Sequence, residues 1–203
     1  LNIAPYCAPD KVDYIVSTVD AYEEDLRAFD EEFKEIMKDY YIGDQNTDLA
    51  TEIVRLLKEK QLKIATAESC SGGLLSSTLV NVSGASSVFL EGIVTYSYES
   101  KLNRLNIDVN RLMEFGAVSE EIAHDMAFNL EKLTGADITV GVTGIAGPGG
   151  GSELKPVGLV YIAINVCGQI FLKSYIFNGN REKIRQRTVA EALYWLHHYI
   201  KAL

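Results

Sequence analysis

The strongest constraint on the fold of this sequence is an alternation of short apolar segments with longer amphipathic ones, from residue 48 to the end of the chain. Leu62–Ala67, Phe89–Tyr96 and Ile138–Thr143 have the length and apolar content of buried strands, and Asp48–Lys60 repeats leucine and isoleucine at helical spacing. The other predicted elements are helices at Leu74–Val80, near Lys101, from Ser119 to Leu133 and over Arg181–Ala202, and a hairpin of Val157–Val166 and Ile170–Ile176 that turns at Cys167–Gln169. This order predicts an α/β fold, a three-layer α/β/α sandwich with a mixed sheet.

The first 46 residues differ in charge from the rest of the chain. They contain 12 acidic and 4 basic residues, whereas residues 47–203 contain 16 and 15, and this shift indicates a domain boundary. Val12–Val19 has the alternation of a strand, Ala21–Asp39 has that of an acidic helix, and Gly43–Thr47 has the composition of a linker. One strand and one helix bury too little surface to fold alone. We therefore predict an appendage over residues 1–45, a main domain over residues 46–203, and a homo-oligomer, with a dimer favoured, that pairs the exposed strand.

Composition narrows the class of partner. The net charge of −9 over 203 residues disfavours nucleic acid, which needs a basic surface, and favours a small-molecule ligand. The longest uncharged apolar stretch, Val157–Ile170, contains Gly158, Asn165 and Gly168 and falls short of the roughly 20 apolar residues of a membrane span. We expect no membrane partner. The chain does not open with a secretory pattern, so a cytoplasmic location is expected.

Cysteine and histidine spacing predicts neither a disulfide framework nor a metal centre. The cysteines are Cys7, Cys70 and Cys167, an odd number without a CxxC pair. The three histidines form no HxxxH or histidine–carboxylate pattern. We therefore expect reduced thiols, no catalytic metal and no cofactor.

A loop rich in hydroxyl groups follows the first predicted buried strand. It reads TAESCSGG at Thr66–Gly73 and leads into a helix, where free backbone N–H groups and the helix dipole stabilise negative charge. Turn formation and helix capping are the ordinary uses of these residue types, so the loop alone leaves both interpretations open.

Two further loops follow predicted strands. Thr95–Lys101 places Tyr96 and Lys101 about one helical turn apart, and a lysine with a lowered pKa can serve as the general base for a serine, although a solvated surface lysine is the alternative. Thr143–Gly158 holds six of the 16 glycines, which lets the backbone approach a ligand closely, although a flexible surface loop has the same composition. It lacks the spacing of a nucleotide-triphosphate loop and of a dinucleotide fingerprint.

The order of these motifs is far more specific than any one of them. TAESCSGG, VTYSYESK, FGAVSEEIA at Phe115–Ala123 and GVTGIAGPGGGSELKPVG together resemble the CinA carboxy-terminal domain family over about Leu49–Leu203. Free-standing members of that family are nicotinamide-nucleotide amidohydrolases of the PncC type. Residues 1–45, IAPYCAPDKVDYIVSTV and DYYIG in particular, are similar to the end of the KH-like segment that precedes this domain in full-length CinA.

The resemblance implies hydrolysis of the carboxamide of nicotinamide mononucleotide to nicotinic acid mononucleotide and ammonia, by serine and lysine chemistry without metal or cofactor. It implies Ser69 as the nucleophile, Lys101 as the base, and Tyr96 as a hydroxyl that relays protons or holds Lys101. The residues implied for oxyanion or substrate binding are Ser71, Gly72, Gly73, Thr143, Gly144, Arg181 and Arg185, with backbone N–H groups around Ser71–Gly73 as oxyanion donors.

Two positions depart from the family's usual pattern. Ser71 stands where threonine is usual and keeps a hydroxyl. Asn180 stands where aspartate is usual, which removes a carboxylate beside Arg181 and leaves Arg185 as an alternative phosphate ligand. Both arginines are equally compatible with solvated helix charges.

Two functions stay open on these residues. The joint presence of Ser69, Tyr96 and Lys101 favours the amidohydrolase, and a noncatalytic ligand-binding or interaction domain of a competence/damage-inducible protein is the alternative. Cys70 is a second possible nucleophile. We favour Ser69, because a cysteine that follows a strand is more often a small buried packing residue.

Overall fold

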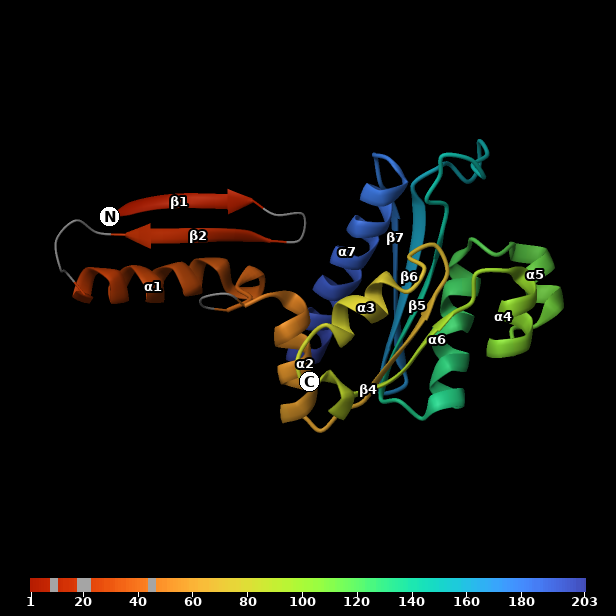
Figure 1. Ribbon diagram of the computed structural model, residues 1–203, viewed down its shortest axis with the longest axis horizontal. Helices are drawn as coiled ribbons and strands as arrows, with labels where there is room; N and C mark the ends of the chain where they lie inside the picture. The colour runs from red at the N-terminus through yellow and green to blue at the C-terminus, as the bar shows by residue number, and fades with distance from the viewer. Residues whose placement is uncertain (8–10, 18–22, 44–46) are drawn as a thin grey trace. The chain divides into compact units, whose positions relative to one another are not determined.

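The computed structural model describes residues 1–7, 11–17, 23–43 and 47–203. The chain forms two compact units, Leu1–Asp48 and Leu49–Leu203, and each contains its own sheet (Figure 1). Most of the predicted linker Gly43–Thr47 lies outside the described residues, as do the end of the predicted Val12–Val19 strand and the start of the predicted Ala21–Asp39 helix.

The first unit is a two-stranded antiparallel sheet with a helix. Its elements are β1 (Asn2–Cys7), β2 (Val12–Ser17), α1 (Glu23–Met37) and the short 3-10 helix η1 (Lys38–Tyr40). Tyr14 of β2 packs edge-on against Phe33 of α1, with ring centroids 5.1 Å apart. The prediction of a single strand was wrong, because Pro5 interrupts the strand pattern of β1 in the sequence. Proline is tolerated there because each strand of a two-stranded ribbon has an unpaired edge.

The second unit contains a mixed five-stranded sheet. Its strands lie in the order β4–β3–β5–β6–β7. Strand β6 runs antiparallel to the other four, which all run in the same direction. The strands are β3 (Ile64–Glu68), β4 (Phe89–Val94), β5 (Ile138–Gly144), β6 (Leu159–Val166) and β7 (Gln169–Ile176). The helices are α2 (Leu49–Glu59), α3 (Leu74–Val80), the 3-10 helix η2 (Ala85–Ser87), α4 (Tyr98–Leu105), α5 (Val109–Phe115), α6 (Glu120–Thr134) and α7 (Arg181–Lys201).

Helices cover both faces of this sheet. Figure 1 shows α2, α3 and α7 on one side and α4, α5 and α6 on the other. The central strands β3, β5 and β6 are accordingly buried and rich in alanine, valine and isoleucine. Gly141 of β5 lets α6 lie close to the sheet, because a Cβ there would overlap the carbonyl oxygen of Ala123. The predicted α/β/α sandwich with a mixed sheet is confirmed. Among the described residues, no helix combines the length and the apolar character needed to cross a membrane.

Capping side chains fix the helices that lead toward the site. Ser119 caps α6 as predicted, since its Oγ accepts from the amide of Ile122 at 3.3 Å. The seven-residue α5 was not predicted, because two turns show little periodicity. Asp108 caps it by accepting from the amides of Asn110 at 2.7 Å and Arg111 at 3.3 Å. Such caps satisfy amides that have no partner inside the helix.

The strand directions bring the chemistry-bearing loops to one edge of the sheet. β3, β4 and β5 are parallel, so their carboxyl ends at Glu68, Val94 and Gly144 lie at the same edge. β6 is antiparallel and begins there, and β7 ends there before α7 starts. Open α/β sheets bind ligands outside the carboxyl ends of their strands.

Candidate active site

The loops at this edge enclose a pocket of about 150 Å³. Its lining residues are Ser69, Cys70, Tyr96, Lys101, Ala117, Val118, Thr143, Gly144, Ala146 and Arg181. Six of the ten residues implied as catalytic or binding therefore meet in one place, Ser69, Tyr96, Lys101, Thr143, Gly144 and Arg181, together with the alternative nucleophile Cys70. The other four, Ser71, Gly72, Gly73 and Arg185, do not line the pocket.

Ser69 and Lys101 form a direct hydrogen bond. Lys101 Nζ donates to Ser69 Oγ at 3.0 Å and to the carbonyl oxygen of Thr95 at 2.7 Å. Ser69 follows β3 directly, and Lys101 lies in α4, whose first turn is capped by Ser97 accepting from the amide of Ser100 at 3.0 Å. The contact thus joins residues 32 positions apart through two adjacent parallel strands.

Burial changes the acid–base behaviour of this lysine. Only 1% of the Lys101 surface is exposed. Removal from water disfavours the ammonium form and lowers the pKa of Lys101 to about 8, against a smaller opposing effect of Cys70. A substantial fraction of Lys101 is therefore neutral near physiological pH and can accept a proton from the adjacent serine hydroxyl.

Cys70 lines the same pocket, and the pKa of its side chain is shifted in the opposite direction from that of Lys101. Burial raises the pKa of its thiol to about 12, which keeps the thiolate population very small. A thiol in this state is a poor nucleophile, and the choice of Ser69 over Cys70 stays a prediction.

The turn of residues 69–73 places its amide groups differently from the sequence interpretation. The amide of Gly73 donates to Oε2 of Glu68 at 3.0 Å, and that of Gly72 donates to the carbonyl oxygen of Ser69 at 3.1 Å. Neither is free to bind an oxyanion, which corrects the assignment of these two glycines. Among the described residues, the amides of Cys70 and Ser71 have no oxygen acceptor, and both donate instead to the Cys70 sulfur, which partly offsets the rise in the pKa of the thiol. Because a thiol sulfur is a weak acceptor, the amides of Cys70 and Ser71 are the candidate oxyanion donors of this turn.

Tyr96 and Arg181 form a pair on the exposed side of the pocket. Arg181 donates from Nη2 to the hydroxyl of Tyr96 at 3.0 Å and from Nη1 to the carbonyl oxygen of Gly147 at 2.9 Å. The Tyr96 hydroxyl was expected to relay protons or hold Lys101. In the structure it holds Arg181 instead, because Lys101 takes its partners from Ser69 and the backbone of Thr95.

Arg185 holds the 69–73 turn rather than the pocket. Its Nε and Nη2 both donate to the carbonyl oxygen of Ser71, at 3.1 and 2.7 Å. Two of its N–H groups are thus committed to the backbone. Arg181, and not Arg185, lines the pocket, so Arg181 is the better placed of the two alternatives for a phosphate.

The segment of residues 115–119 contributes Ala117 and Val118 to the lining of the pocket. Thr143 Oγ1 donates to the carbonyl oxygen of Ala117 at 2.6 Å, and Lys155 Nζ donates to the carbonyl oxygens of Phe115 and Val118 at 2.7 and 2.6 Å. Lys155 belongs to the glycine-rich loop between β5 and β6. The loop therefore supports this segment with the side chain of Lys155.

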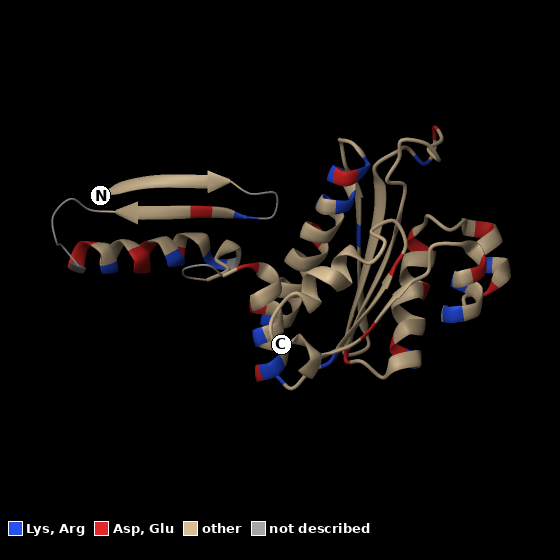
Figure 2. Ribbon diagram, in the orientation of Figure 1, with Lys and Arg blue, Asp and Glu red and all other residues tan. Residues whose placement is uncertain are grey.

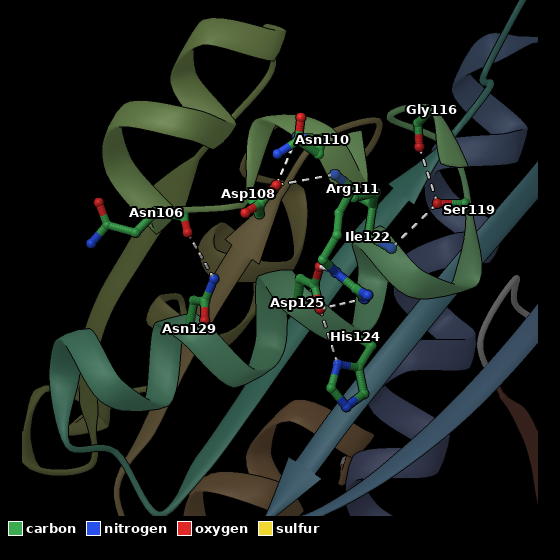
Figure 3. Close-up of polar contacts among 10 residues, drawn as sticks. All are labelled: Asn106, Asp108, Asn110, Arg111, Gly116, Ser119, Ile122, His124, Asp125 and Asn129. Carbon is green, nitrogen blue, oxygen red and sulfur yellow. Dashed lines mark hydrogen bonds and ion pairs between the residues drawn. The ribbon is translucent and has the colours of Figure 1, made fainter. Parts of the chain in front are cut away.

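Polar contacts between α5 and α6 fix both ends of the same segment (Figure 3). Ser119 Oγ donates to the carbonyl oxygen of Gly116 at 3.0 Å while it caps α6. Arg111 of α5 binds Asp125 of α6 through two N–H groups, Nε at 2.7 Å and Nη2 at 3.0 Å. The segment thus enters the pocket from two helices that are held to each other.

Several site residues were not identified from the sequence. Ala117, Val118 and Ala146 contribute backbone and small side chains, and the FGAVSEEIA motif contains the first two without indicating their role. The side chains of Glu68 and Lys155 hydrogen-bond to backbone groups of other segments. No residue spacing in the sequence indicates such contacts. Among the described residues, no three histidine, cysteine, aspartate or glutamate side chains gather into a group that could hold a metal ion.

Comparison with known proteins agrees with the motifs. Residues 46–200 match the model of the CinA C-terminal domain. The chain belongs to the CinA family. A competence-damage inducible protein of Clostridioides difficile is 52% identical over 155 residues, which cover 76% of this chain and 37% of that protein. A competence-damage inducible protein of Clostridium botulinum is 46% identical over 172 residues, which cover 85% of this chain and 42% of that protein. The chain thus spans about two fifths of the length of these curated relatives.

Solved structures show the same fold for the second unit. A CinA superfamily protein of Klebsiella pneumoniae superposes with a TM-score of 0.74 at 34% identity, covering 76% of this chain and 97% of that one. A competence/damage inducible protein of Agrobacterium tumefaciens gives a TM-score of 0.69 at 37% identity, with the same coverage. The predicted family resemblance is confirmed.

Proposed function

We propose that this CinA-family chain hydrolyses the carboxamide of nicotinamide mononucleotide to nicotinic acid mononucleotide and ammonia. The observation that carries the proposal is the buried hydrogen bond between Lys101 Nζ and Ser69 Oγ, with the pKa of the lysine lowered to about 8. A serine next to a neutral amine is an activated nucleophile, and amide hydrolysis is a reaction that such a pair supports.

The two residues divide the reaction into acylation and deacylation. Neutral Lys101 takes the proton of Ser69 as Oγ attacks the carboxamide carbon, and the carbonyl electrons move to the oxygen. When the oxyanion collapses, the carbon–nitrogen bond breaks and the leaving nitrogen takes the proton from Lys101, so ammonia departs. Water then attacks the resulting ester of Ser69 and gives its proton to Lys101, which returns it to Ser69 as the carboxylic acid product leaves and ionises.

The 69–73 turn supplies hydrogen-bond donors for the charge that develops on the carbonyl oxygen. The amides of Cys70 and Ser71 have no oxygen acceptor among the described residues, and they adjoin the nucleophile in the chain. Amides held in place before the reaction stabilise an oxyanion at a cost of little reorganisation, and removal of one such donor typically lowers kcat by roughly 10²–10³-fold.

The size and lining of the pocket support a mononucleotide as substrate. A volume of about 150 Å³ suits a pyridine ring with its carboxamide, whereas pockets that enclose a whole drug-sized ligand occupy about 300–1,000 Å³. The ribose and phosphate of the substrate must therefore lie toward solvent. Arg181 lines the pocket there, and its bonds to Tyr96 and Gly147 leave guanidinium N–H groups for a phosphate.

The test is direct. The purified chain is incubated with nicotinamide mononucleotide, with and without EDTA, and ammonia and nicotinic acid mononucleotide are measured. We expect equimolar release of both products, unaffected by the chelator and abolished by Ser69→Ala. Binding of the nucleotide without release of ammonia would support the noncatalytic alternative. Loss of activity in EDTA that zinc or magnesium restores would refute the metal-free mechanism.

A further inference from the structure

A fully buried carboxylate lies directly before the proposed nucleophile. Glu68 is the last residue of β3 and has no exposed surface. Its Oε2 accepts from the amides of Gly73 and Leu75, both at 3.0 Å, and its Oε1 accepts from the amide of Ser76 at 2.7 Å and from the Ser76 hydroxyl. The side chain therefore connects the end of the strand to the start of α3 across the whole 69–73 turn.

This arrangement is more extensive than the capping of a short helix requires. A serine or threonine side chain satisfies one or two helix amides. Here one carboxylate accepts four hydrogen bonds, and the Ser76 hydroxyl shares a further bond of 2.7 Å with Thr66 Oγ1, also a fully buried residue of β3. Burial of a charge is costly unless its hydrogen bonds are satisfied, so the network has one well-defined geometry.

The same geometry determines which amides of the turn have an oxygen acceptor. Glu68 engages the amide of Gly73, whose φ of +88° closes the turn, and Arg185 engages the carbonyl oxygen of Ser71 from the other side. Within the part of the chain that the structure describes, the amides of Cys70 and Ser71 have no oxygen acceptor and only the weakly accepting Cys70 sulfur as partner. The turn is thus held at its end by Glu68 and at its middle by Arg185.

We propose that Glu68 is a positioning residue for the reaction. It holds the 69–73 turn so that Ser69 Oγ meets Lys101 Nζ and the amides of Cys70 and Ser71 face the reacting carbonyl. The inference rests on the proposed amidohydrolase function. Glu68 does not line the pocket, so it acts on the substrate only through this turn.

The decisive variant is Glu68→Gln, which has the same size but only one acceptor oxygen and no charge. It loses acceptors for two of the four hydrogen bonds, so the turn relaxes. We expect kcat for nicotinamide mononucleotide to fall by about 10²-fold, the effect of losing an oxyanion donor. KM should change by less than about threefold, because the binding residues Thr143 and Arg181 belong to other segments, and loss of a purely transition-state interaction leaves ground-state binding intact.

A matched control separates positioning from general destabilisation. Thr139 is also fully buried, and its Oγ1 donates to the carbonyl oxygen of Ala127 at 2.7 Å, near the end of β5 opposite to Thr143. Thr139→Val removes this buried bond at similar volume. Both variants are assayed as full chains, at a temperature where circular dichroism shows each to be folded. We expect Thr139→Val to keep the wild-type kcat.

A second readout does not depend on the substrate assignment. A fluorophosphonate probe reacts with activated serines, and its labelling of Ser69 is followed by mass spectrometry, with Ser69→Ala as the blank. Labelling should be slowed by Glu68→Gln and unchanged in Thr139→Val. If the wild type is labelled but releases no ammonia, the proposed substrate is wrong and the labelling rates alone decide the role of Glu68. Wild-type labelling and turnover in folded Glu68→Gln, equal losses in both variants, or a wild type that the probe does not label would overturn the inference.

Discussion

The two units of the chain differ in what they bury. The unit Leu49–Leu203 buries twelve polar or charged side chains: Thr66, Glu68, Ser69, Ser71, Thr95, Lys101, Ser119, Thr139, Thr143, Asn165, Thr188 and His197. Among its described residues, the unit Leu1–Asp48 buries none, and it exposes large apolar side chains more densely, eight in 48 residues against twelve in the other 155, among them Ile3, Tyr6, Tyr14, Ile15 and Ile36. Figure 2 shows acidic residues along α1 of that unit.

This difference separates chemistry from association. Burying polar groups costs free energy unless each has a partner, so those that gather at the carboxyl end of β3, β4 and β5, namely Glu68, Ser69, Ser71, Thr95, Lys101 and Thr143, indicate a site. Exposed apolar side chains in a small unit indicate a surface for association, since they favour contact with another surface. We therefore expect substitutions in the second unit to change turnover and changes in the first unit to affect assembly.

The largest effect is expected at the reacting pair. Ser69→Ala and Lys101→Met should each lower kcat by at least ~10³-fold, because each removes an essential part of one catalytic unit. The double variant should be no worse than either single variant. Turnover of the folded variants is measured by release of ammonia.

Cys70→Ala is the matched control for this pair, since it changes an adjacent buried residue of the same pocket. It should keep most of the activity and lose some stability. An inactive Cys70→Ala enzyme together with an active Ser69→Ala enzyme would assign the nucleophile to the thiol.

The next effect is that of pH. Lys101 must be neutral to take the serine proton, and its pKa is lowered to about 8 by burial. Activity should therefore rise with pH through one ionisation, by roughly 100-fold between pH 6 and pH 9, and level off above that range. A profile of kcat/KM against pH measures this in the free enzyme. A flat profile between pH 6 and pH 9 would exclude Lys101 as the base.

A smaller, binding-type effect is expected at the exposed side of the pocket. Arg181→Met removes the cation that lines the pocket beside Tyr96, and a charge-assisted hydrogen bond contributes about 1.5–3 kcal/mol. KM for the mononucleotide should rise about 10- to 100-fold with little change in kcat. Nicotinamide riboside, which lacks the phosphate, is the internal control: it should be a substrate at least ~10-fold poorer than the mononucleotide for the wild type and unaffected by the substitution. An equal loss for both substrates would place Arg181 in a structural role.

The buried strands could be predicted from the sequence, whereas the partners of the arginines at the site could not. The strands β3, β5 and β6 are apolar throughout, so their order and burial are evident from local composition. Ser69 and Lys101 follow strands, and strand directions bring them together. The partners of the arginines are different, because Arg181 meets Tyr96 and Arg185 meets Ser71 across 85 and 114 positions of the chain. Such contacts depend on how α7 packs, which no local pattern specifies.

Lys101 also links activity to stability. Lowering its pKa from 10.5 to about 8 means that burial of the ammonium costs roughly 3 kcal/mol, of which its two hydrogen bonds offset about 1. Lys101→Met should therefore raise the free energy of unfolding at pH 7 by ~2 kcal/mol while it abolishes turnover. The gain should be complete below about pH 8 and disappear above about pH 10.5, where the lysine is neutral in both folded and unfolded chains. Denaturant unfolding at pH 7 and pH 11 measures it, and a less stable variant at pH 7 would contradict the assigned cost.

The smallest effect on turnover is expected from removal of the first unit. The pocket is formed entirely by residues of Leu49–Leu203. The match to the solved Klebsiella pneumoniae protein covers 97% of that protein but only 76% of this chain. A chain of residues 46–203 should therefore keep kcat and KM within about twofold, since no catalytic group is removed. The number of copies in its oligomer, or its solubility, should decrease, because the truncation removes the exposed apolar side chains of β1, β2 and α1, which suit pairing with a second copy. Light scattering and ammonia release are measured on the same preparation. A truncated chain of unchanged oligomeric state that has lost its activity would reverse the assignment and give the first unit a part in the site.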